Sequence, residues 1–237
     1  NSVFMSQTAE PVGRHITERY LGVLSPLGIK SARRAMKLVV GGEARRTADI
    51  LLKEQKVRPG RRLAVLVPGT TWASKNWPAY LYAQTARLLA RDFEIVLCGG
   101  RAELGMGLDI QMRAGVRLIN VIGETSLQQM AAVIERADVL VAGDTGPLYM
   151  ADAVGTPTVS IFGPTNPAVY APRGSRHVFL CNTLRCSFCH KTTCRKGEAV
   201  CIASITPQAV VQGVYKVTGL PRRHPSWGKP VLKDEPE

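Results

Sequence analysis

The stretch DVLVAGDTGPLYMADAVGTPTVSIF (residues 138–162) decides the fold class. The elements it predicts are a buried strand over 138–142, a helix over 147–154 and a second strand over 157–162. Pro147 suits the first turn of the helix because its missing N–H would have no partner there, and Gly155 suits the helix end. A strand, a helix and a strand in this order predict a βαβ unit with parallel strands.

The same alternation extends upstream of this unit. Short apolar runs rich in β-branched residues indicate strands, and longer runs with an apolar stripe indicate helices. The predicted strands are 63–67, 93–98 and 117–121, and the predicted helices are 78–91, 101–114 and 126–136. Five strands with intervening helices predict an α/β protein with a doubly wound, Rossmann-like parallel sheet.

The segments on either side of this block are less regular. Before it we expect a helix over 16–27, a short strand over 37–40, a helix over 43–55 and a basic hinge over 56–62. After it we expect a short strand over 178–180, a cysteine-rich loop and a helix over 206–217. The tail from residue 221 is rich in proline and charge, and we expect it to be disordered.

The composition is that of a globular chain with an excess of positive charge. Its 237 residues are 45% hydrophobic and 21% charged, which excludes the intrinsically disordered class. The net charge of +13 divides into +8 over residues 1–62, +3 over 63–205 and +2 over 206–237, and it favours an anionic partner. The sequence shows neither a transmembrane run nor a secretory signal, so we expect an intracellular location. Because the chain opens in mid-pattern at Asn1, we also expect a missing upstream segment.

The loops that follow the strands hold the candidate ligand-binding residues, since ligands of open parallel sheets bind beyond the carboxyl ends of the strands. The loop at 68–78 offers the small residues Thr70 and Thr71, and Lys75 as a mobile positive charge for a phosphate. The alternative is that Lys75 is an ordinary surface lysine. Glu103, after the second strand, is suited to accept hydrogen bonds from ribose hydroxyls, or else only to satisfy the dipole of the next helix.

The loop Gly143-Asp-Thr-Gly-Pro147 is the most informative. It joins a strand to the N-terminus of a helix, where unpaired N–H groups and the positive end of the dipole favour a pyrophosphate. The alternative, that Asp144 or Thr145 only caps the helix, does not explain why Gly146 follows them. The turn at 163–167 is adequately explained as a plain turn.

Several common motifs are missing from the sequence. A G-x-G-x-x-G fingerprint and a P-loop are both absent, which weakens a dehydrogenase or ordinary NTPase interpretation. There is also no G-x-S-x-G nucleophile elbow and no H-E-x-x-H metal motif.

Five short motifs nevertheless occur in a characteristic order. They are Lys75-x-Trp77-Pro78, Gly99-Gly-x-x-Glu103, Gly123-Glu-Thr-Ser-Leu127, Asp144-Thr-Gly-Pro147 and Phe162-Gly-Pro-Thr165. Together, over about residues 15–218, they resemble the C-terminal half of glycosyltransferase family 9, the lipopolysaccharide heptosyltransferases. The resemblance implies the GT-B architecture of two Rossmann-like domains, and an inverting, metal-independent transfer of heptose from an ADP-activated donor without a cofactor.

The resemblance also implies roles for individual residues. Lys75 would bind the donor phosphates and Glu103 the ribose or adenosine side. The diphosphate and sugar would contact Asp144, Thr145 and Gly146, with Thr70, Thr71 and Pro147 beside them. Tyr149 stands where the family usually has a histidine near the donor sugar, and we favour a packed helix residue at this position. Val67 likewise replaces a histidine that is frequent in the family.

The domain organisation follows from the same resemblance. The parts are 1–55 as the end of an N-terminal acceptor domain, 56–62 as a hinge, 63–205 as the donor-binding domain, 206–220 as a C-terminal helix and 221–237 as a tail. The family's catalytic aspartate belongs to the N-terminal domain. We therefore expect the catalytic base to lie outside this chain.

Six cysteines in an intracellular chain favour thiols or a metal over a disulfide framework. Cys98 falls in a predicted buried strand. The others cluster late in the chain, and a zinc site or a redox-sensitive pair could form from Cys186, Cys189, Cys194 and Cys201, with Cys181 nearby. A reduced, packed loop is the simpler expectation, because cysteines are frequent in this loop of the family.

Three functions are compatible with these observations. The favoured one is a glycosyltransferase that binds a nucleotide sugar and a lipopolysaccharide core or other glycolipid acceptor, at the inner face of the inner membrane and without nucleic acid. The second is a basic nucleic-acid-binding protein with a cysteine-rich zinc module, which the low aromatic content of 6% disfavours. The third is an inactive nucleotide-binding remnant.

Overall fold

One parallel sheet organises the chain. The computed structural model describes residues 13–29 and 35–221, so the predicted tail lies almost wholly outside the described residues. Six strands pair in the order β3-β2-β1-β4-β5-β6. They are β1 (Arg62–Val67), β2 (Phe93–Leu97), β3 (Ile119–Asn120), β4 (Val139–Gly143), β5 (Thr158–Phe162) and β6 (His177–Cys181). The predicted doubly wound sheet is confirmed, and the late strand joins it as β6.

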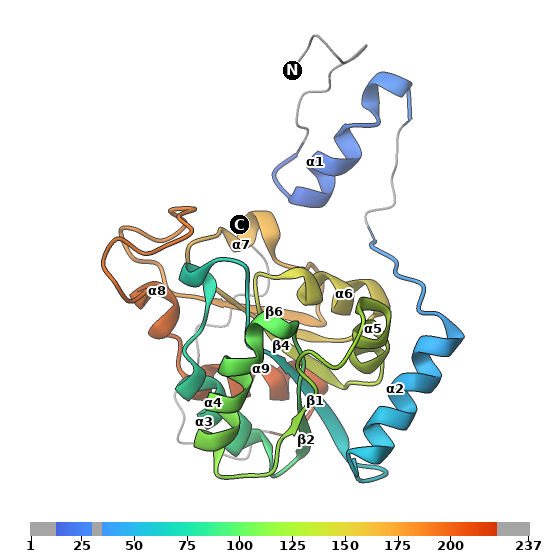
Figure 1. Ribbon diagram of the computed structural model, residues 1–237. Coiled ribbons are helices and arrows are strands. Elements are labelled where there is room, and N and C mark those ends of the chain that lie inside the picture. Colours follow the sequence, from blue (N-terminus) through green and yellow to red (C-terminus); the bar gives the residue numbers. More distant parts are fainter. Residues whose placement is uncertain (1–12, 30–34, 222–237) are drawn as a thin grey trace.

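Helices cover both faces of the sheet (Figure 1). One face carries α3 (Ala79–Leu89), α4 (Leu104–Ala114) and α9 (Pro207–Thr218), and the other carries α2 (Gly42–Glu54), α5 (Leu127–Glu135) and α6 (Gly146–Val154). Successive side chains of a strand point to opposite faces of the sheet. Leu66 accordingly packs in the core with α3, α4 and α9, and Val65 packs in the core with α2, α5 and α6. Because both faces are buried, β1 reads as a continuous apolar run.

Shorter elements complete the chain. They are α1 (Ile16–Gly22), α7 (Pro167–Tyr170), α8 (Val200–Ala203) and the 3₁₀ turns η2 (Ser25–Leu27), η3 (Ala73–Lys75) and η4 (Arg101–Glu103). Figure 1 shows α1 above α6 and α7, beyond the end of the sheet where the strands finish. The strand order reverses direction between β1 and β4, and this switch point is where doubly wound proteins bind their ligands.

Two of the predictions for the first 62 residues need correction. The predicted strand over 37–40 is wrong: Leu38 makes one backbone hydrogen bond, to the carbonyl of Ala153 at the end of α6, and no described strand lies beside it to pair. The predicted helix over 16–27 is two elements, α1 and η2, since Pro26 lacks the N–H that a continuous helix would use.

The basic segment before β1 is tied to the sheet rather than free. Arg58 forms an ion pair with the buried Glu94 of β2. Arg61 donates to the carbonyls of Ala90 and Arg91, each at 3.0 Å, where α3 ends. Part of the positive charge of residues 1–62 therefore serves the fold itself.

The buried thiol of Cys98 makes stability sensitive to alkaline pH. Burial raises its pKa from 9.0 to about 12, so between these values the unfolded chain loses a proton that the folded chain keeps. Stability must therefore fall as pH rises above 9. We expect urea unfolding in the presence of a reductant to show a loss of about 1.4 kcal/mol between pH 8 and pH 10 from this thiol. In Cys98→Ala that share of the loss should vanish; equal losses in both proteins would contradict the assignment.

Candidate functional site

A cavity of about 530 Å³ lies at the carboxyl ends of β1 and β4. Six of the predicted residues line it, namely Thr71, Lys75, Asp144, Thr145, Gly146 and Tyr149. They come from two loops about seventy positions apart that the switch point brings together. We call this cavity the donor pocket, after the ligand that the sequence resemblance leads us to expect, and its volume falls within the range of small-molecule sites.

An ion pair forms the wall of the donor pocket. Lys75 Nζ lies 2.7 Å from Asp144 Oδ2, and both side chains are nearly buried, with exposed fractions of 12% and 7%. The same ammonium group lies 4.1 Å from the centre of the Trp72 ring, which is within cation–π distance. The interpretation of Lys75 as an ordinary surface lysine is therefore wrong, because burial and two partners fix its charge at the pocket.

The N-terminus of α6 faces the same space. Thr145 is the N-cap residue, yet its side chain makes no capping hydrogen bond. The carboxylate of Asp144 is engaged by Lys75 and by the Tyr149 hydroxyl, which lies 3.2 Å from Oδ1. A purely capping role thus fails for both residues, and the helix end presents its N–H groups without a side-chain cap.

Tyr149 is more than a packed helix residue. Its hydroxyl lies 3.0 Å from the carbonyl oxygen of Tyr170 as well as near Asp144, and the single phenolic proton serves these two acceptors. Burial, followed by the negative charge of Asp144, raises the pKa of Tyr149. The phenol therefore stays neutral at physiological pH and holds Asp144 in place.

Three predicted residues do not line the donor pocket. The Thr70 hydroxyl donates within its own loop, at 2.8 Å from the Trp72 carbonyl oxygen. Pro147 opens α6. Glu103 is half-buried and lies against Gly69, where an added Cβ would come within 1.9 Å of its Cγ. Glycine at position 69 is thus required by the close approach of Glu103 to the end of β1.

The structure adds residues that the sequence did not single out. Trp72 and Tyr170 line the donor pocket, and α1 contributes Ile16, Thr17 and Tyr20. Thr165 also lines this pocket; its side chain is 2% exposed, and its buried Oγ1 has no hydrogen-bond partner in the described part of the chain. A buried hydroxyl without a partner costs stability.

His15 fixes α1 beside the pocket. Its Nε2 lies 2.9 Å from the carbonyl oxygen of Ala171, and its Nδ1 lies 2.7 Å from the Thr17 hydroxyl. Burial lowers the pKa of His15, so the ring is neutral at pH 7. This hydrogen bond joins His15 to Ala171, 156 positions further along the chain, and so explains how α1 forms a wall of the pocket beside α7.

The late cysteines share a separate cavity of about 260 Å³. Four of its lining residues are Cys186, Cys189, Cys194 and Cys201, and all are free thiols. Within residues 13–29 and 35–221, no group of three or more His, Cys, Asp or Glu side chains is arranged to hold a metal ion. The zinc interpretation thus gains no support from the described structure, and the zinc-module function rests on spacing alone.

The sheet order and the pocket at its switch point define a Rossmann-like domain with a candidate ligand site. A family model described as glycosyltransferase family 9 (heptosyltransferase) matches residues 2–200. The chain therefore belongs to glycosyltransferase family 9.

Curated relatives agree with this assignment. The chain is 32% identical over 167 residues to lipopolysaccharide heptosyltransferase 1 of Pseudomonas aeruginosa, covering 64% of this chain and 47% of the relative. It is 30% identical over 158 residues to lipopolysaccharide heptosyltransferase 2 of Escherichia coli, covering 61% and 43%. The chain thus spans about half the length of the curated relatives it matches.

Solved structures show the same fold. A family 9 glycosyltransferase from Veillonella parvula superposes with a TM-score of 0.77 at 22% identity, over 91% of this chain and 64% of that one. The E. coli heptosyltransferase WaaC, solved with ADP, gives a TM-score of 0.62 at 20% identity, over 91% and 61%. The α/β architecture is therefore that of the GT-B heptosyltransferases over about three fifths of the length of these two structures.

Proposed function

We propose that this chain binds the ADP-activated heptose donor of a lipopolysaccharide heptosyltransferase. The observation that carries the proposal is the convergence of Lys75 and the N-terminus of α6 on one cavity at the switch point. Both are positive groups that suit a diphosphate. The ADP bound to the E. coli relative of similar fold supports the same ligand class.

The geometry suits the chemistry of a diphosphate leaving group. When the bond between the anomeric carbon and the diphosphate breaks, negative charge grows on the phosphate oxygens. The Lys75 ammonium and the N–H groups of α6 would stabilise that charge, and preorganised donors of this kind give the largest effect in a site sheltered from water. Trp72 and Asp144 hold the ammonium at the pocket wall before the donor arrives.

Asp144 is a positioning residue in this proposal and not the base. Its two oxygens are already engaged by Lys75 and Tyr149. An inverting single displacement needs a base on the face of the sugar opposite the diphosphate. We propose that the family's acceptor domain supplies it, and that residues 1–55 are the end of that domain. In the structure, α2 packs against α5 of the donor-binding part through Ala44, Ala48 and Leu52.

The acceptor side of the proposal is a lipopolysaccharide core, reached from the inner face of the inner membrane. The names of the curated relatives support this acceptor class. No helix in the described part of the chain is both long enough and apolar enough to cross a bilayer. A peripheral position on the membrane would then rest on surface charge.

Calorimetric titration with nucleotides tests the donor assignment. We expect the chain to bind ADP and ADP-heptose and to bind UDP-glucose much more weakly. A second assay would follow heptose transfer to heptose-deficient lipopolysaccharide. ADP binding without transfer would identify a donor-binding part that lacks the base, whereas absence of ADP binding would contradict the proposed function.

A further inference from the structure

A basic loop beside the donor pocket has no role in the function proposed above. Its exposed cationic side chains are Arg185, Lys191, Arg195 and Lys196. Among the described residues, none of these four takes part in an ion pair. No Asp or Glu occurs between positions 153 and 197, and the nearest acidic residue along the chain is Glu198, two positions after Lys196. We call residues 185–196 the basic loop.

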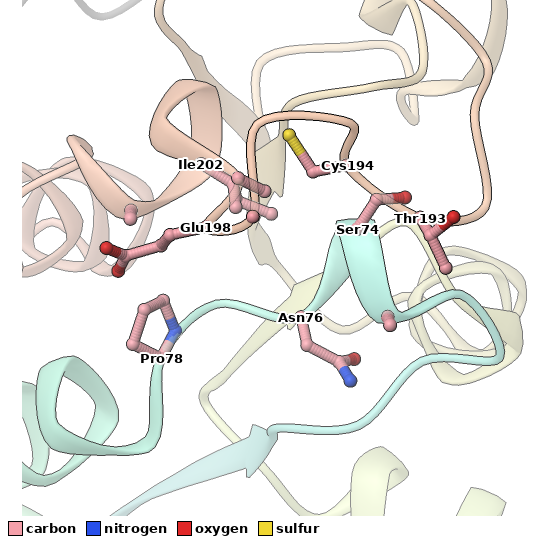
Figure 2. Close-up of a pocket in the computed structure, with 11 residues that line it drawn as sticks. Ser74, Asn76, Pro78, Thr193, Cys194, Glu198 and Ile202 are labelled. Carbon is pink, nitrogen blue, oxygen red and sulfur yellow. The ribbon is translucent and has the colours of Figure 1, made fainter.

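The basic loop is anchored to the segment that carries Lys75. The backbone N–H of Ser74 donates to the carbonyl oxygen of Thr192 at 3.1 Å, and its hydroxyl donates to that of Lys191 at 2.5 Å. Figure 2 shows Ser74 facing Thr193 and Cys194 across the cavity between the two segments. Since Ser74 directly precedes Lys75, this anchor fixes the loop at the edge of the donor pocket.

A second anchor joins the basic loop to the opposite side of the pocket. The backbone N–H of His190 donates to the carbonyl oxygen of Pro164 at 2.9 Å, next to Thr165. The His190 ring lies 6.0 Å from the ring of Tyr170, which lines the donor pocket. The loop is therefore held from both sides at the carboxyl edge of the sheet.

Three of the four cationic residues border one cavity. Lys191, Arg195 and Lys196 all line the 260 Å³ cavity, together with Ser74 and Thr193, although the surface that these residues present to it is mostly apolar. Burial, with smaller contributions from the neighbouring cysteines, raises the pKa of the Cys201 thiol in this cavity. That thiol is neutral at pH 7 and does not offset the positive charge. Glu198 borders the other cavity, and Figure 2 shows its carboxylate extending away from Cys194 and Thr193, on the side of Pro78.

We propose that Lys191, Arg195 and Lys196 bind a phosphate or carboxylate group of the acceptor glycan next to the donor. The proposal rests on the proposed function, because a glycan acceptor must approach the donor sugar at this edge of the sheet. Long cationic side chains that are exposed on one short loop, and unpaired among the described residues, suit an anionic group on a flexible glycan.

The test is a charge-neutralised loop, Lys191→Gln/Arg195→Gln/Lys196→Gln, in the full 237-residue chain. The probe is the water-soluble phosphorylated oligosaccharide obtained by deacylating heptose-deficient lipopolysaccharide, titrated in the presence of saturating ADP. We expect affinity to fall about tenfold, the size expected for three exposed charge contacts. ADP affinity, measured first without the glycan, should stay unchanged, which also shows that the variant is folded.

A matched control removes the same number of positive charges from a surface outside the basic loop. Arg46→Gln/Lys53→Gln/Arg91→Gln removes three exposed cations from α2 and from the end of α3, and should bind the glycan like the wild type. Equal losses in the two triple variants would overturn the proposal in favour of net charge alone. So would failure of the wild type to bind the glycan while it binds ADP, an outcome that leaves the donor assignment standing.

A bilayer is the competing anionic surface. Vesicles of phosphatidylcholine and phosphatidylglycerol in equal parts, compared with pure phosphatidylcholine, measure it directly. If the loop variant loses vesicle binding while its affinity for the soluble glycan is that of the wild type, the loop is a membrane contact and the proposal is wrong. Phosphatase treatment of the glycan then separates phosphate from carboxylate recognition, since affinity falls only in the first case.

Discussion

A Lys75→Met variant is expected to bind ADP roughly tenfold to a hundredfold more weakly than the wild type. Methionine keeps an unbranched apolar stem beside Trp72 and removes only the charge that faces the donor pocket. The variant should also lose about 3 kcal/mol of unfolding free energy, because Asp144 is left as a nearly buried carboxylate without its cation. Calorimetry with ADP and urea unfolding measure the two effects separately.

A second variant separates the structural part of this effect from the binding part. In Lys75→Met/Asp144→Asn no unpaired carboxylate remains, and the asparagine carbonyl can still accept the hydrogen bond from Tyr149. We expect it to recover about 2 kcal/mol of the stability while ADP binding stays weak. The exposed Lys53→Met serves as the control and should change neither quantity. Wild-type ADP affinity in Lys75→Met would show that the diphosphate binds elsewhere.

The sheet could be predicted from the sequence because its strands are buried on both faces. Residues 63–67 and 139–142 read as continuous apolar runs for that reason. The same rule misleads at 37–40, where Leu38, Val39 and Val40 resemble a strand. There Val40 packs with the core cluster around α2 while Val39 is 72% exposed, and a strand needs a neighbour that no local pattern can supply.

The site was only partly predictable, since sequence identifies loops but not the pairs they form. Lys75 and Asp144 each follow from their own loop, whereas the ion pair between them depends on the strand order. The loop at 163–167 looks like a plain turn until burial shows the Thr165 hydroxyl without a partner. The contribution of α1 depends on the contact between His15 and Ala171 across 156 positions, which leaves no local signal.

The excess of positive charge acquires a different meaning in the structure. Many arginines of residues 1–62 and of the sheet domain pair with carboxylates or cap helix carbonyls: Arg45 pairs with Glu135, Arg58 with Glu94, and Arg61 caps α3. The net charge of +8 on residues 1–62 is therefore a poor guide to where an anion binds. Unpaired cations that line a common cavity, as in the basic loop, are the better indicator.

The largest effect on stability is expected from Trp77→Ala, two positions beyond Lys75. Trp77 is fully buried, its ring lies 4.8 Å from that of Tyr82 in an edge-to-face arrangement, and its indole N–H donates to the carbonyl oxygen of Ile205 at 3.0 Å. Removing the ring leaves a cavity under α3 and should cost about 4 kcal/mol. Thermal unfolding should move down by about 10 °C.

Trp77→Phe tests which part of the side chain matters. Phenylalanine retains a ring against Tyr82 but cannot donate to Ile205, whose carbonyl would be left without this donor, so we expect a smaller loss of about 2 kcal/mol. Because Trp77 does not line the donor pocket, ADP affinity of the folded protein should be that of the wild type in both variants. Losses of equal size in the two variants would show that the hydrogen bond, and not the packing, dominates. In that case the two residues of the motif Lys75-x-Trp77-Pro78 would have separate roles. Lys75 would bind the ligand, and Trp77 would attach the segment between α8 and α9 to the sheet domain through its hydrogen bond to Ile205.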